Sequence, residues 1–416
     1  MTRRGFFTAL GGAGLFAAGS RLLPHLEDAS AEGMVLSAHD GILPFYGVHQ
    51  SGIITQQQQN SYFAAFDLVT TKREDIVAML KRWTEATARM TKGQTAAEID
   101  KDTTKPAGDS GEVLHLRSAN LTLTFGFGAG LFTKDGKDRY GLASKRPAAL
   151  VDMPKFNGDQ LIAEKSGGDI SVQACAEDPQ VAFHAVRQLA RLAADVAQIR
   201  WAQAGFLSGA GGGETPRNLM GFKDGTQQPK PAEHDKFVWV GAEGPDWMQG
   251  GSYVVARRIR IALEHWDNTQ VDFQEEVVGR RKYSGAPLTG KVETDALDLA
   301  AADKDGNSVI PDNAHVRLAN AATNGGAQIL RRGYSYNDGV NFTAERWPPW
   351  KQGMEYDAGL FFLCYQQDPR EGFIKIFDKM AKLDALNQFA THTSNGVFAC
   401  PPGVHEGEFI GQKLFA

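Results

Sequence analysis

The sequence has few cysteines, and their spacing excludes several kinds of metal and cofactor site. None of Cys175, Cys364 and Cys400 lies in a Cys-x-x-Cys pair, which excludes a zinc ribbon and the covalent attachment of a c-type haem. Because three is an odd number, a framework in which every cysteine is paired is also excluded. These cysteines lie in or directly after apolar runs that are typical of strands, so we predict buried free thiols.

The sequence also lacks an excess of positive charge. It contains 44 Lys and Arg against 49 Asp and Glu, for a net charge of −5. Phosphate binding needs concentrated Lys and Arg, so nucleic acid is not expected as a main partner. A hydrophobic fraction of 42% and a charged fraction of 22% are typical of a soluble globular protein. The 416 residues suffice for two domains of ordinary size or one large one.

The first 31 residues have the anatomy of an export signal. Arg3 and Arg4 precede Phe-Phe and an apolar, Gly- and Ala-rich run through Ala18, and Ala-Ser-Ala at residues 29–31 is a small-x-small cleavage site. The adjacent arginines indicate twin-arginine export, which carries folded proteins. An uncleaved membrane anchor is disfavoured because the run is shorter than the ~20 residues of a spanning helix. We therefore expect a periplasmic protein, or an extracellular one where the host lacks an outer membrane.

Apolar periodicity predicts two similar halves. Strands are predicted at residues 60–69, 121–127, 169–176, 252–263 and 359–366, and helices at residues 72–91, 179–203 and 370–386. In each half a cysteine-containing strand precedes Asp-Pro, at residues 178–179 and 368–369, where Asp caps a helix and Pro occupies its first turn. The separation of roughly 190 residues indicates an internal duplication.

This order predicts an α+β fold of two ferredoxin-like domains, each β-α-β-β-α-β with an antiparallel sheet. A doubly wound parallel sheet would need regular alternation of strands and helices with buried Val and Ile runs, which the sequence lacks. We divide the chain into a signal at residues 1–31, an N-terminal domain at residues 32–235 and a C-terminal domain at residues 236–416.

Three segments contain residue types that perform chemistry, although each has an ordinary structural explanation. Asp224-Gly225 is typical of a tight turn. His315 lies in a strand-like segment, where a histidine is more often a hydrogen-bonded structural group than a ligand. Arg331 and Arg332 would point to opposite faces of a strand. An inward arginine needs an anionic partner, since an unpaired buried charge is costly, so a bound anionic ligand is one interpretation.

Taken together, these segments resemble dye-decolorising peroxidases, most closely the twin-arginine-exported deferrochelatase/peroxidase branch. The matching segments are the signal, Asn-Leu-Met-Gly-Phe-Lys-Asp-Gly-Thr at residues 218–226, His-Val-Arg-Leu-Ala-Asn at 315–320, Ile-Leu-Arg-Arg-Gly-Tyr-Ser-Tyr at 329–336, Gly-Leu-Phe-Phe at 359–362 and Phe-Ala-Cys-Pro-Pro-Gly at 398–403. The Gly-x-x-Asp-Gly motif is weak alone. Followed in order by the histidine and the Leu-Arg-Arg-Gly-Tyr segment, it is specific.

The resemblance implies one non-covalent haem b per chain, bound mainly in the C-terminal half. His315 matches the proximal ligand of the iron, Asp224 the acid–base residue on the peroxide side, and Arg331 the arginine beside it. Asp384 is the candidate for a carboxylate that hydrogen-bonds the proximal histidine. The implied haem contacts are Gly225, Thr226, Gln227, Asn320, Ala321, Ala322 and Arg331, with Leu360 and Phe362 as an apolar pair beside the distal pocket. Ala321 and Ala322 replace the Pro-Arg that often follows this asparagine in the family.

The function implied by the resemblance is reduction of hydrogen peroxide, with oxidation of organic donors or dyes through a ferryl intermediate. Release of iron from haem with the porphyrin left intact, an activity attributed to the exported branch, would use the same pocket with haem as substrate. Two alternatives from other classes stay open: a haem-binding protein without turnover, and a structural module without haem. The other partners to consider are a second copy of the chain, in a homodimer, and components of an iron-uptake system.

Overall fold

The computed structural model describes residues 41–208, 214–344 and 352–416. The predicted export signal, at residues 1–31, lies outside this part of the chain. These described residues belong to one compact unit. None of the helices in the described ranges is both long enough and apolar enough to cross a membrane.

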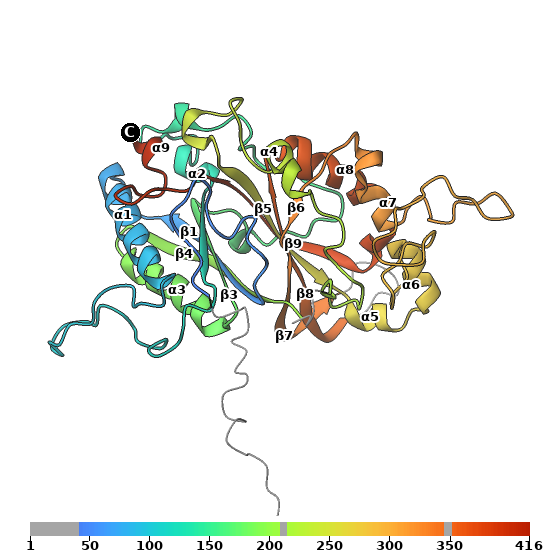
Figure 1. Cartoon of the computed structure of the whole chain (residues 1–416), viewed down its shortest axis with the longest axis horizontal. Coiled ribbons are helices and arrows are strands. Elements are labelled where there is room, and N and C mark those ends of the chain that lie inside the picture. The colour runs from blue at the N-terminus through green and yellow to red at the C-terminus, as the bar shows by residue number, and fades with distance from the viewer. Residues whose placement is uncertain (1–40, 209–213, 345–351) are drawn as a thin grey trace, which may run out of the picture. The chain divides into compact units, whose positions relative to one another are not determined.

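The strands form one antiparallel sheet that closes on itself (Figure 1). Within the described residues the order is β5-β9-β2-β3-β1-β4-β7-β8-β6, and β5 also pairs with β8. The strands are β1 (Asn60–Leu68), β2 (Thr122–Phe127), β3 (Ile170–Ala176), β4 (Ala197–Phe206), β5 (Ser252–Ile261), β6 (Leu330–Arg331), β7 (Tyr334–Ala344), β8 (Gln352–Gln366) and β9 (Ala390–Cys400). Cys175, Cys364 and Cys400 are buried and unpaired, which confirms the predicted free thiols.

Both halves of the chain have the same strand order. The N-terminal half contains β2-β3-β1-β4 and the C-terminal half β7-β8-β5-β9, so each half places its first strand between its third and its fourth. The predicted α+β class with two ferredoxin-like halves is therefore confirmed. The halves join where β2 pairs with β9, at Phe127 and Ala399, and where β4 pairs with β7, at Phe206 and Ser335. The boundary between residues 235 and 236 stays a prediction.

The helices pack on the outside of these strands (Figure 1). They are α1 (Arg73–Met90), α2 (Ala129–Phe132), α3 (Pro179–Leu192), α4 (His234–Phe237), α5 (Leu263–Asp267), α6 (Val271–Val278), α7 (His315–Ala319), α8 (Lys375–Leu383) and α9 (Gln412–Phe415). Helices α1 and α3 pack against each other, and α3 also packs against β1 and β3. The predicted cap is present, because the Asp178 side chain accepts hydrogen bonds from the backbone N–H groups of Gln180 and Val181.

The helix predicted at residues 179–203 is too long. Helix α3 ends at Leu192, and β4 begins five residues later, at Ala197. The Ala- and Gln-rich sequence favours a helix by propensity. As a helix it would leave one edge of β1 unpaired, whereas β4 pairs with β1 along its whole length. Burial alternates near the end of β4, with Trp201 and Gln203 buried, as expected for a strand.

The helix predicted at residues 370–386 is divided into parts. A π-helical turn at Arg370–Ile374 leads into α8, and a short 3₁₀-helix follows at Ala385–Gln388. Asp384, between the two, has an extended backbone, with φ −68° and ψ 122°. The predicted strand at residues 359–366 is longer than expected and begins at Gln352.

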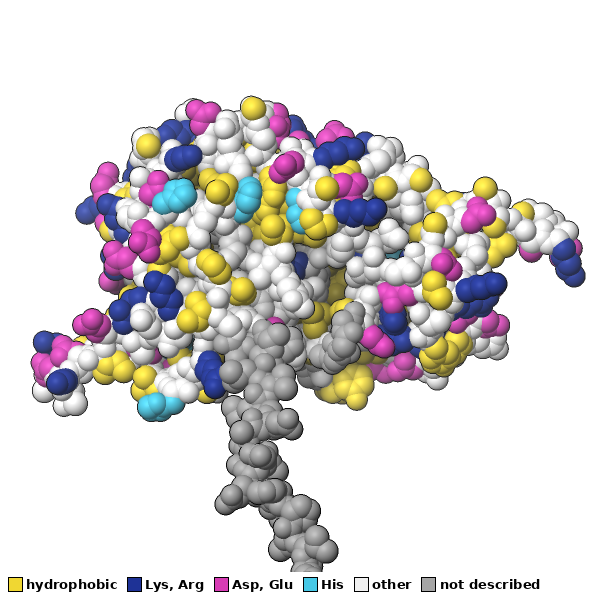
Figure 2. All heavy atoms as spheres, viewed as in Figure 1, with side chains coloured by type: hydrophobic (Ala, Val, Ile, Leu, Met, Phe, Trp, Pro, Cys, Tyr) yellow, Lys and Arg dark blue, Asp and Glu magenta, His cyan; other side chains and the backbone are white. Residues whose placement is uncertain are grey.

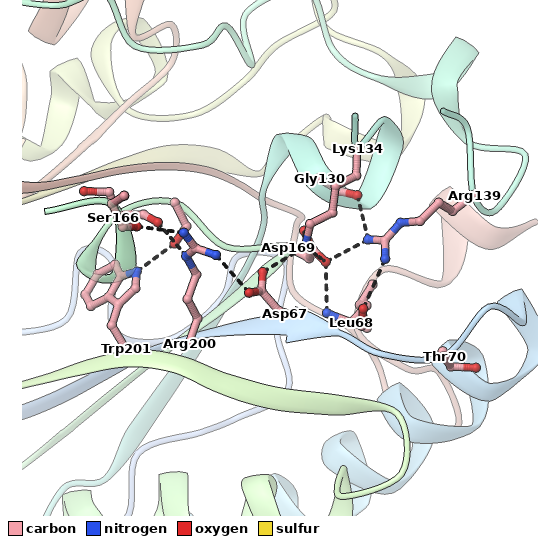
Figure 3. Close-up of polar contacts among 12 residues, drawn as sticks. Asp67, Leu68, Thr70, Gly130, Lys134, Arg139, Ser166, Asp169, Arg200 and Trp201 are labelled. Carbon is pink, nitrogen blue, oxygen red and sulfur yellow. Dashed lines mark hydrogen bonds and ion pairs between the residues drawn. The ribbon is translucent and has the colours of Figure 1, made fainter. Parts of the chain in front are cut away.

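Charged side chains of both signs are interspersed on the face that Figure 2 shows. Other charged side chains form ion pairs that are partly buried (Figure 3). Asp169, which is 2% exposed, accepts hydrogen bonds from Arg139 at 2.7 Å and Lys134 at 3.1 Å. Lys134 also contacts Asp67 at 3.0 Å, and Asp67 pairs with Arg200 of β4 at 2.9 Å. Each buried carboxylate therefore has a cation, and the segment after β2 is tied to β1 and β4.

A second buried cluster consists of His184 on α3 and two acids of the polar segment that precedes β2. His184 Nδ1 lies 3.1 Å from Glu112 Oε1, and His184 Nε2 lies 3.3 Å from Asp109 Oδ2. Burial would raise the pKa of Glu112, but hydrogen bonds from Ser110 and His184 lower this pKa to about 2. A metal ion binds one imidazole nitrogen, whereas here the two nitrogens face different carboxylates. The cluster therefore joins the segment to α3 by polar side-chain contacts.

The Arg258 guanidinium joins four strands inside the closed sheet. Arg258, on β5, is 3% exposed. Its Nε donates to Gln203 of β4 at 2.9 Å and its Nη1 to Thr393 of β9 at 3.1 Å. Its Nη2 donates to Asp338 of β7 at 2.8 Å and Asp357 of β8 at 2.7 Å. One side chain therefore connects the N-terminal half with three strands of the C-terminal half.

We expect Arg258→Met to lower the free energy of unfolding by about 3–5 kcal/mol, because two carboxylates would lose their buried cation. Lys382→Met is the matched control, since Lys382 and Asp378 form an ion pair with both side chains more than half exposed. Loss of this exposed ion pair should change the free energy of unfolding by at most about 0.5 kcal/mol. Urea unfolding followed by circular dichroism measures both, and equal effects would contradict this role for Arg258.

Candidate active site

A tight turn presents Asp224. The Asn218 side chain accepts hydrogen bonds from the backbone N–H groups of Met220, at 3.1 Å, and Phe222, at 3.3 Å. The backbone N–H of Asp224 donates to the carbonyl of Pro216 at 2.8 Å. Gly225 has a φ of +129°, a conformation that other residues rarely adopt. The tight turn therefore lies at residues 219–222, between the bridged residues Arg217 and Lys223, and not at the Asp-Gly pair as predicted. Asp224 directly follows this turn, and its side chain contacts Arg331.

Arg331 and Asp224 form an ion pair. Arg331 Nη1 donates to Asp224 Oδ1 at 2.8 Å, and Nη2 donates to the Gln227 carbonyl at 3.0 Å. On β6, Arg331 lies opposite Cys364 of β8. Opposed residues share a face of an antiparallel sheet, and side chains alternate along a strand. Arg331 therefore shares its face with Leu360 and Phe362, both half-buried.

Gln228 fixes the backbone of Arg331, and the sequence analysis did not identify it. Gln228 Nε2 donates to the Arg331 carbonyl, and the Arg331 N–H donates to Gln228 Oε1, both at 2.9 Å. The side-chain amide thus replaces a neighbouring strand at this edge. The repeated Gln-Gln after the Asp-Gly-Thr motif was the available signal, but an amide marks no chemistry by itself.

Arg332 points to the opposite face, as alternation predicts, and is 3% exposed. An inward arginine was expected to have an anionic partner, but neutral oxygen atoms accept the hydrogen bonds of Arg332. Its guanidinium donates to the backbone carbonyl of Thr55 and to the side-chain oxygen of Gln58. Fixed carbonyl dipoles replace a carboxylate here, so the inference from a buried arginine to an anionic ligand was wrong for this residue.

His315 begins a short helix, α7, and not the strand that its apolar surroundings suggested. The carbonyl of Ala314 accepts from the backbone N–H groups of Arg317 and Leu318, each at 3.1 Å, which starts the helical turn. His315 Nδ1 lies 2.7 Å from Asp384 Oδ2. Asp384 is 6% exposed and reaches His315 because α8 ends just before it. This is the contact that the resemblance implied.

The charges around His315 act on its pKa. Burial would lower the pKa of the imidazole, but the negative charge of Asp384 and the hydrogen bond to it raise the pKa above the usual value. Asp224 adds a smaller effect in the same direction, and Arg331 opposes it. The structure therefore brings His315 near the Asp224–Arg331 pair, although these residues are far apart in the sequence.

The surroundings of His315 fit a haem. The side chain lies deep enough for burial to be the largest influence on its pKa, yet 34% of it is accessible. The imidazole is therefore partly enclosed but still accessible to a ligand. Because Asp384 engages Nδ1, Nε2 is the nitrogen left for a metal. Leu360 and Phe362 are half-buried apolar side chains of the kind that a porphyrin contact needs, and their contact with haem stays a prediction.

The remaining predicted contacts lie on two segments. Gly225, Thr226 and Gln227 directly follow Asp224. Asn320 ends α7 and caps a 3₁₀-helix at Ala321–Asn324, where its Oδ1 accepts from the Ala322 N–H at 2.9 Å. Their roles as haem contacts stay predictions.

Known proteins resemble the chain over nearly its whole length. Family models match residues 50–207 as "Dyp-type peroxidase, N-terminal" and residues 215–405 as "Dyp-type peroxidase, C-terminal". The dye-decolorizing peroxidase of Thermobifida fusca is 38% identical, with 99% of this chain and 97% of that protein covered. The deferrochelatase of Escherichia coli (strain K12) is 35% identical, with 99% and 96% covered. The oxyferrous complex of DtpA from Streptomyces lividans is 40% identical with a TM-score of 0.81, covering 92% of this chain and 100% of that one.

We expect Asp384→Asn to destabilise the haem-free protein more at about pH 5.5 than at about pH 9, because the pKa of His315 is raised in the fold. The pairing with Asp384 stabilises the fold fully at pH values below the pKa of His315 in the unfolded chain, about 6.5. This stabilisation is lost as pH rises through the higher pKa of His315 in the folded protein. Asparagine keeps the size of the side chain and its cap on Leu386. Denaturant unfolding at both pH values measures the difference, and Asp312→Asn, at an exposed position, is the control. If the difference in unfolding free energy between wild type and Asp384→Asn does not decrease as pH rises, the pairing of Asp384 with His315 is contradicted.

Proposed function

The chain belongs to the Dyp-type peroxidase family of haem-dependent enzymes, and we propose that it is an exported peroxidase in which His315 holds the iron, Asp224 transfers the proton and Arg331 stabilises charge. The observation that carries these roles is the 2.8 Å pair of Asp224 and Arg331, close enough to His315 for both charges to act on its pKa. A bound haem supplies the redox chemistry, and the protein positions and tunes it.

Asp224 is the proposed acid–base group. Its Oδ1 is engaged by Arg331, while Oδ2 has only a long contact, 3.5 Å, with Asn218 Nδ2. Oδ2 is therefore the oxygen placed to accept a proton from hydrogen peroxide and to return it to the departing oxygen atom. A positioned proton-transfer group contributes roughly 10²- to 10⁴-fold in rate.

The guanidinium of Arg331 stabilises negative charge that develops on peroxide oxygen. Its hydrogen bond to Oδ1 also orients the Asp224 carboxylate. Leu360 and Phe362, on the same face, limit water in the site, which strengthens both interactions. On the other side, Asp384 fixes the ring of His315 and makes its free nitrogen a better donor to iron.

Release of iron from haem is the second candidate function. A relative at 35% identity over nearly the whole chain is named a deferrochelatase. The same pocket would take haem as substrate. Metal-free porphyrin is fluorescent, so its appearance after incubation with haem would favour this function, whereas a stable haem spectrum would favour peroxidation alone.

We expect Asp224→Asn to retain the Soret band of the haem-loaded protein, because the His315 side is unchanged. The spectral change on adding hydrogen peroxide should slow by roughly 10²- to 10⁴-fold, since an amide cannot accept the proton. Asp152→Asn, at a position with an 85% exposed side chain, is the control and should react like wild type. Wild-type kinetics in Asp224→Asn would contradict the acid–base role of Asp224, whereas a wild-type protein with a Soret band and no response to peroxide would favour a haem-binding protein without turnover.

We also propose export by the twin-arginine route, which the arginine pair at residues 3–4 and the cleavage site at residues 29–31 support. Replacing both arginines by lysine should leave the protein in the cytoplasm with its signal uncleaved. Cell fractionation and the mass of the mature protein measure this outcome. Correct export of the lysine variant, or equal export from a host without the twin-arginine translocase, would refute the route.

A further inference from the structure

Glu293 holds both ends of the turn that precedes Asp224. Its Oε1 accepts hydrogen bonds from the hydroxyl groups of Thr226, at 3.0 Å, and Thr215. Its Oε2 accepts from Lys223 Nζ at 2.6 Å. One of these partners precedes the turn, one adjoins Asp224, and one follows it by two residues. No motif marked Glu293, because it is a single acid in a polar segment about 70 residues away.

The segment that contains Glu293 is itself fixed. Arg280, which is 5% exposed, donates from Nη1 to the carbonyls of Gly285, at 2.7 Å, and Glu293, at 2.9 Å. Gly285 has a φ of +76°, and a Cβ there would lie 2.8 Å from Cδ of Lys223. Glycine is therefore needed for Lys223 to pass and reach Glu293. A held backbone and a close approach together set the position of the carboxylate.

Glu293 is ionised in this arrangement. Burial would raise its pKa, but the hydrogen bonds from Lys223, Thr215 and Thr226 lower it below the usual range. A charged acceptor makes stronger hydrogen bonds than a neutral one. The turn is consequently held by charge-assisted bonds at three points and not by loop packing alone.

We propose that Glu293 is a positioning residue for the peroxide reaction: it holds the turn so that Asp224 stays in line with Arg331 and its Oδ2 faces the substrate. This inference rests on the proposed function, because it assigns no chemistry to Glu293 itself. Proton transfer depends steeply on geometry, and a displacement of about 1 Å can reduce a rate by roughly 10²-fold. Loosening the turn should therefore slow proton transfer without removing the haem.

The test compares haem-loaded Glu293→Gln with wild type by stopped-flow absorption. Glutamine keeps the shape but loses the charge and cannot accept from Lys223 on its nitrogen. We expect an unchanged Soret band and a reaction with hydrogen peroxide slowed by roughly 10- to 100-fold. Binding of cyanide to the ferric protein should slow in parallel, because hydrogen cyanide must also lose a proton in the site. Glu293→Asp should recover part of both rates.

Glu275→Gln is the matched control. The Glu275 side chain has a similar exposure, 11% against 16% for Glu293. It binds Arg281 at 2.7 Å and the backbone of Lys282 at 2.9 Å, and not the turn. It should react like wild type. If Glu293→Gln does not fold, Thr215→Val, which removes one of the three bonds without changing size, decides the matter: a slowed reaction supports the inference, and wild-type rates overturn it.

The outcomes separate this inference from the proposed function. Wild-type rates in Glu293→Gln together with a slow Asp224→Asn would overturn the role of Glu293 and leave Asp224 as the acid–base group. Wild-type rates in both variants would overturn the proposed function as well. A Glu293→Gln protein that is slow with peroxide but normal with cyanide, and not recovered by aspartate, would also overturn the role, because its effect would then not pass through proton transfer.

Discussion

The buried Arg258 guanidinium is the interaction on which the rest of the architecture depends. Each ferredoxin-like half alone would leave open sheet edges, and within the described residues the strand pairing between the halves consists of one residue pair at each junction. Arg258 crosses this gap with bonds to β4, β7, β8 and β9. Because β8 also carries β6 and the apolar pair Leu360 and Phe362, the same cation indirectly sets the place of Arg331. A charge that is costly to bury thus connects the strands, since groups on four of them satisfy it.

The site is assembled from short irregular segments held against this rigid sheet. Asp224 lies directly after a turn, His315 on a helix of five residues and Asp384 at the break between two helices. Such segments have little stability of their own, so each is fixed by a polar side chain from elsewhere: Asp384 orients His315, and Glu293 holds the turn of Asp224. The break after α8 is part of this design. If the helix continued through Asp384, the direction of its carboxylate would be set by the helix. The extended backbone instead lets one carboxylate oxygen accept from the Leu386 N–H and the other contact His315.

Local signals made much of the fold predictable. Alternating apolar residues identified β1, β2, β3 and β5, and Asp178-Pro179 marked the start of α3, because those patterns depend on near neighbours. Strand β4 was missed, since its Ala- and Gln-rich sequence favours a helix and only the open edge of β1 decides otherwise. A five-residue helix is too short to show a period, so His315 was placed in a strand. The site residues were recognised through a family resemblance, and Glu293 and Gln228, which match no motif, became visible only through their contacts.

The two adjacent arginines show how narrowly the site is determined. Arg331 and Arg332 have the same chemistry, and a shift of one residue in the pairing of β6 with β8 would exchange their faces. Arg332 would then stand beside Asp224, and Arg331 would enter an interior lined by carbonyl oxygens. Two features oppose this shift. The paired bonds of Gln228 to the Arg331 backbone fix one edge of β6, and Gln58 with the Thr55 carbonyl fits a guanidinium at position 332. The interior arginine therefore sets the register that delivers its neighbour to Asp224, so Arg332 serves the site without touching it.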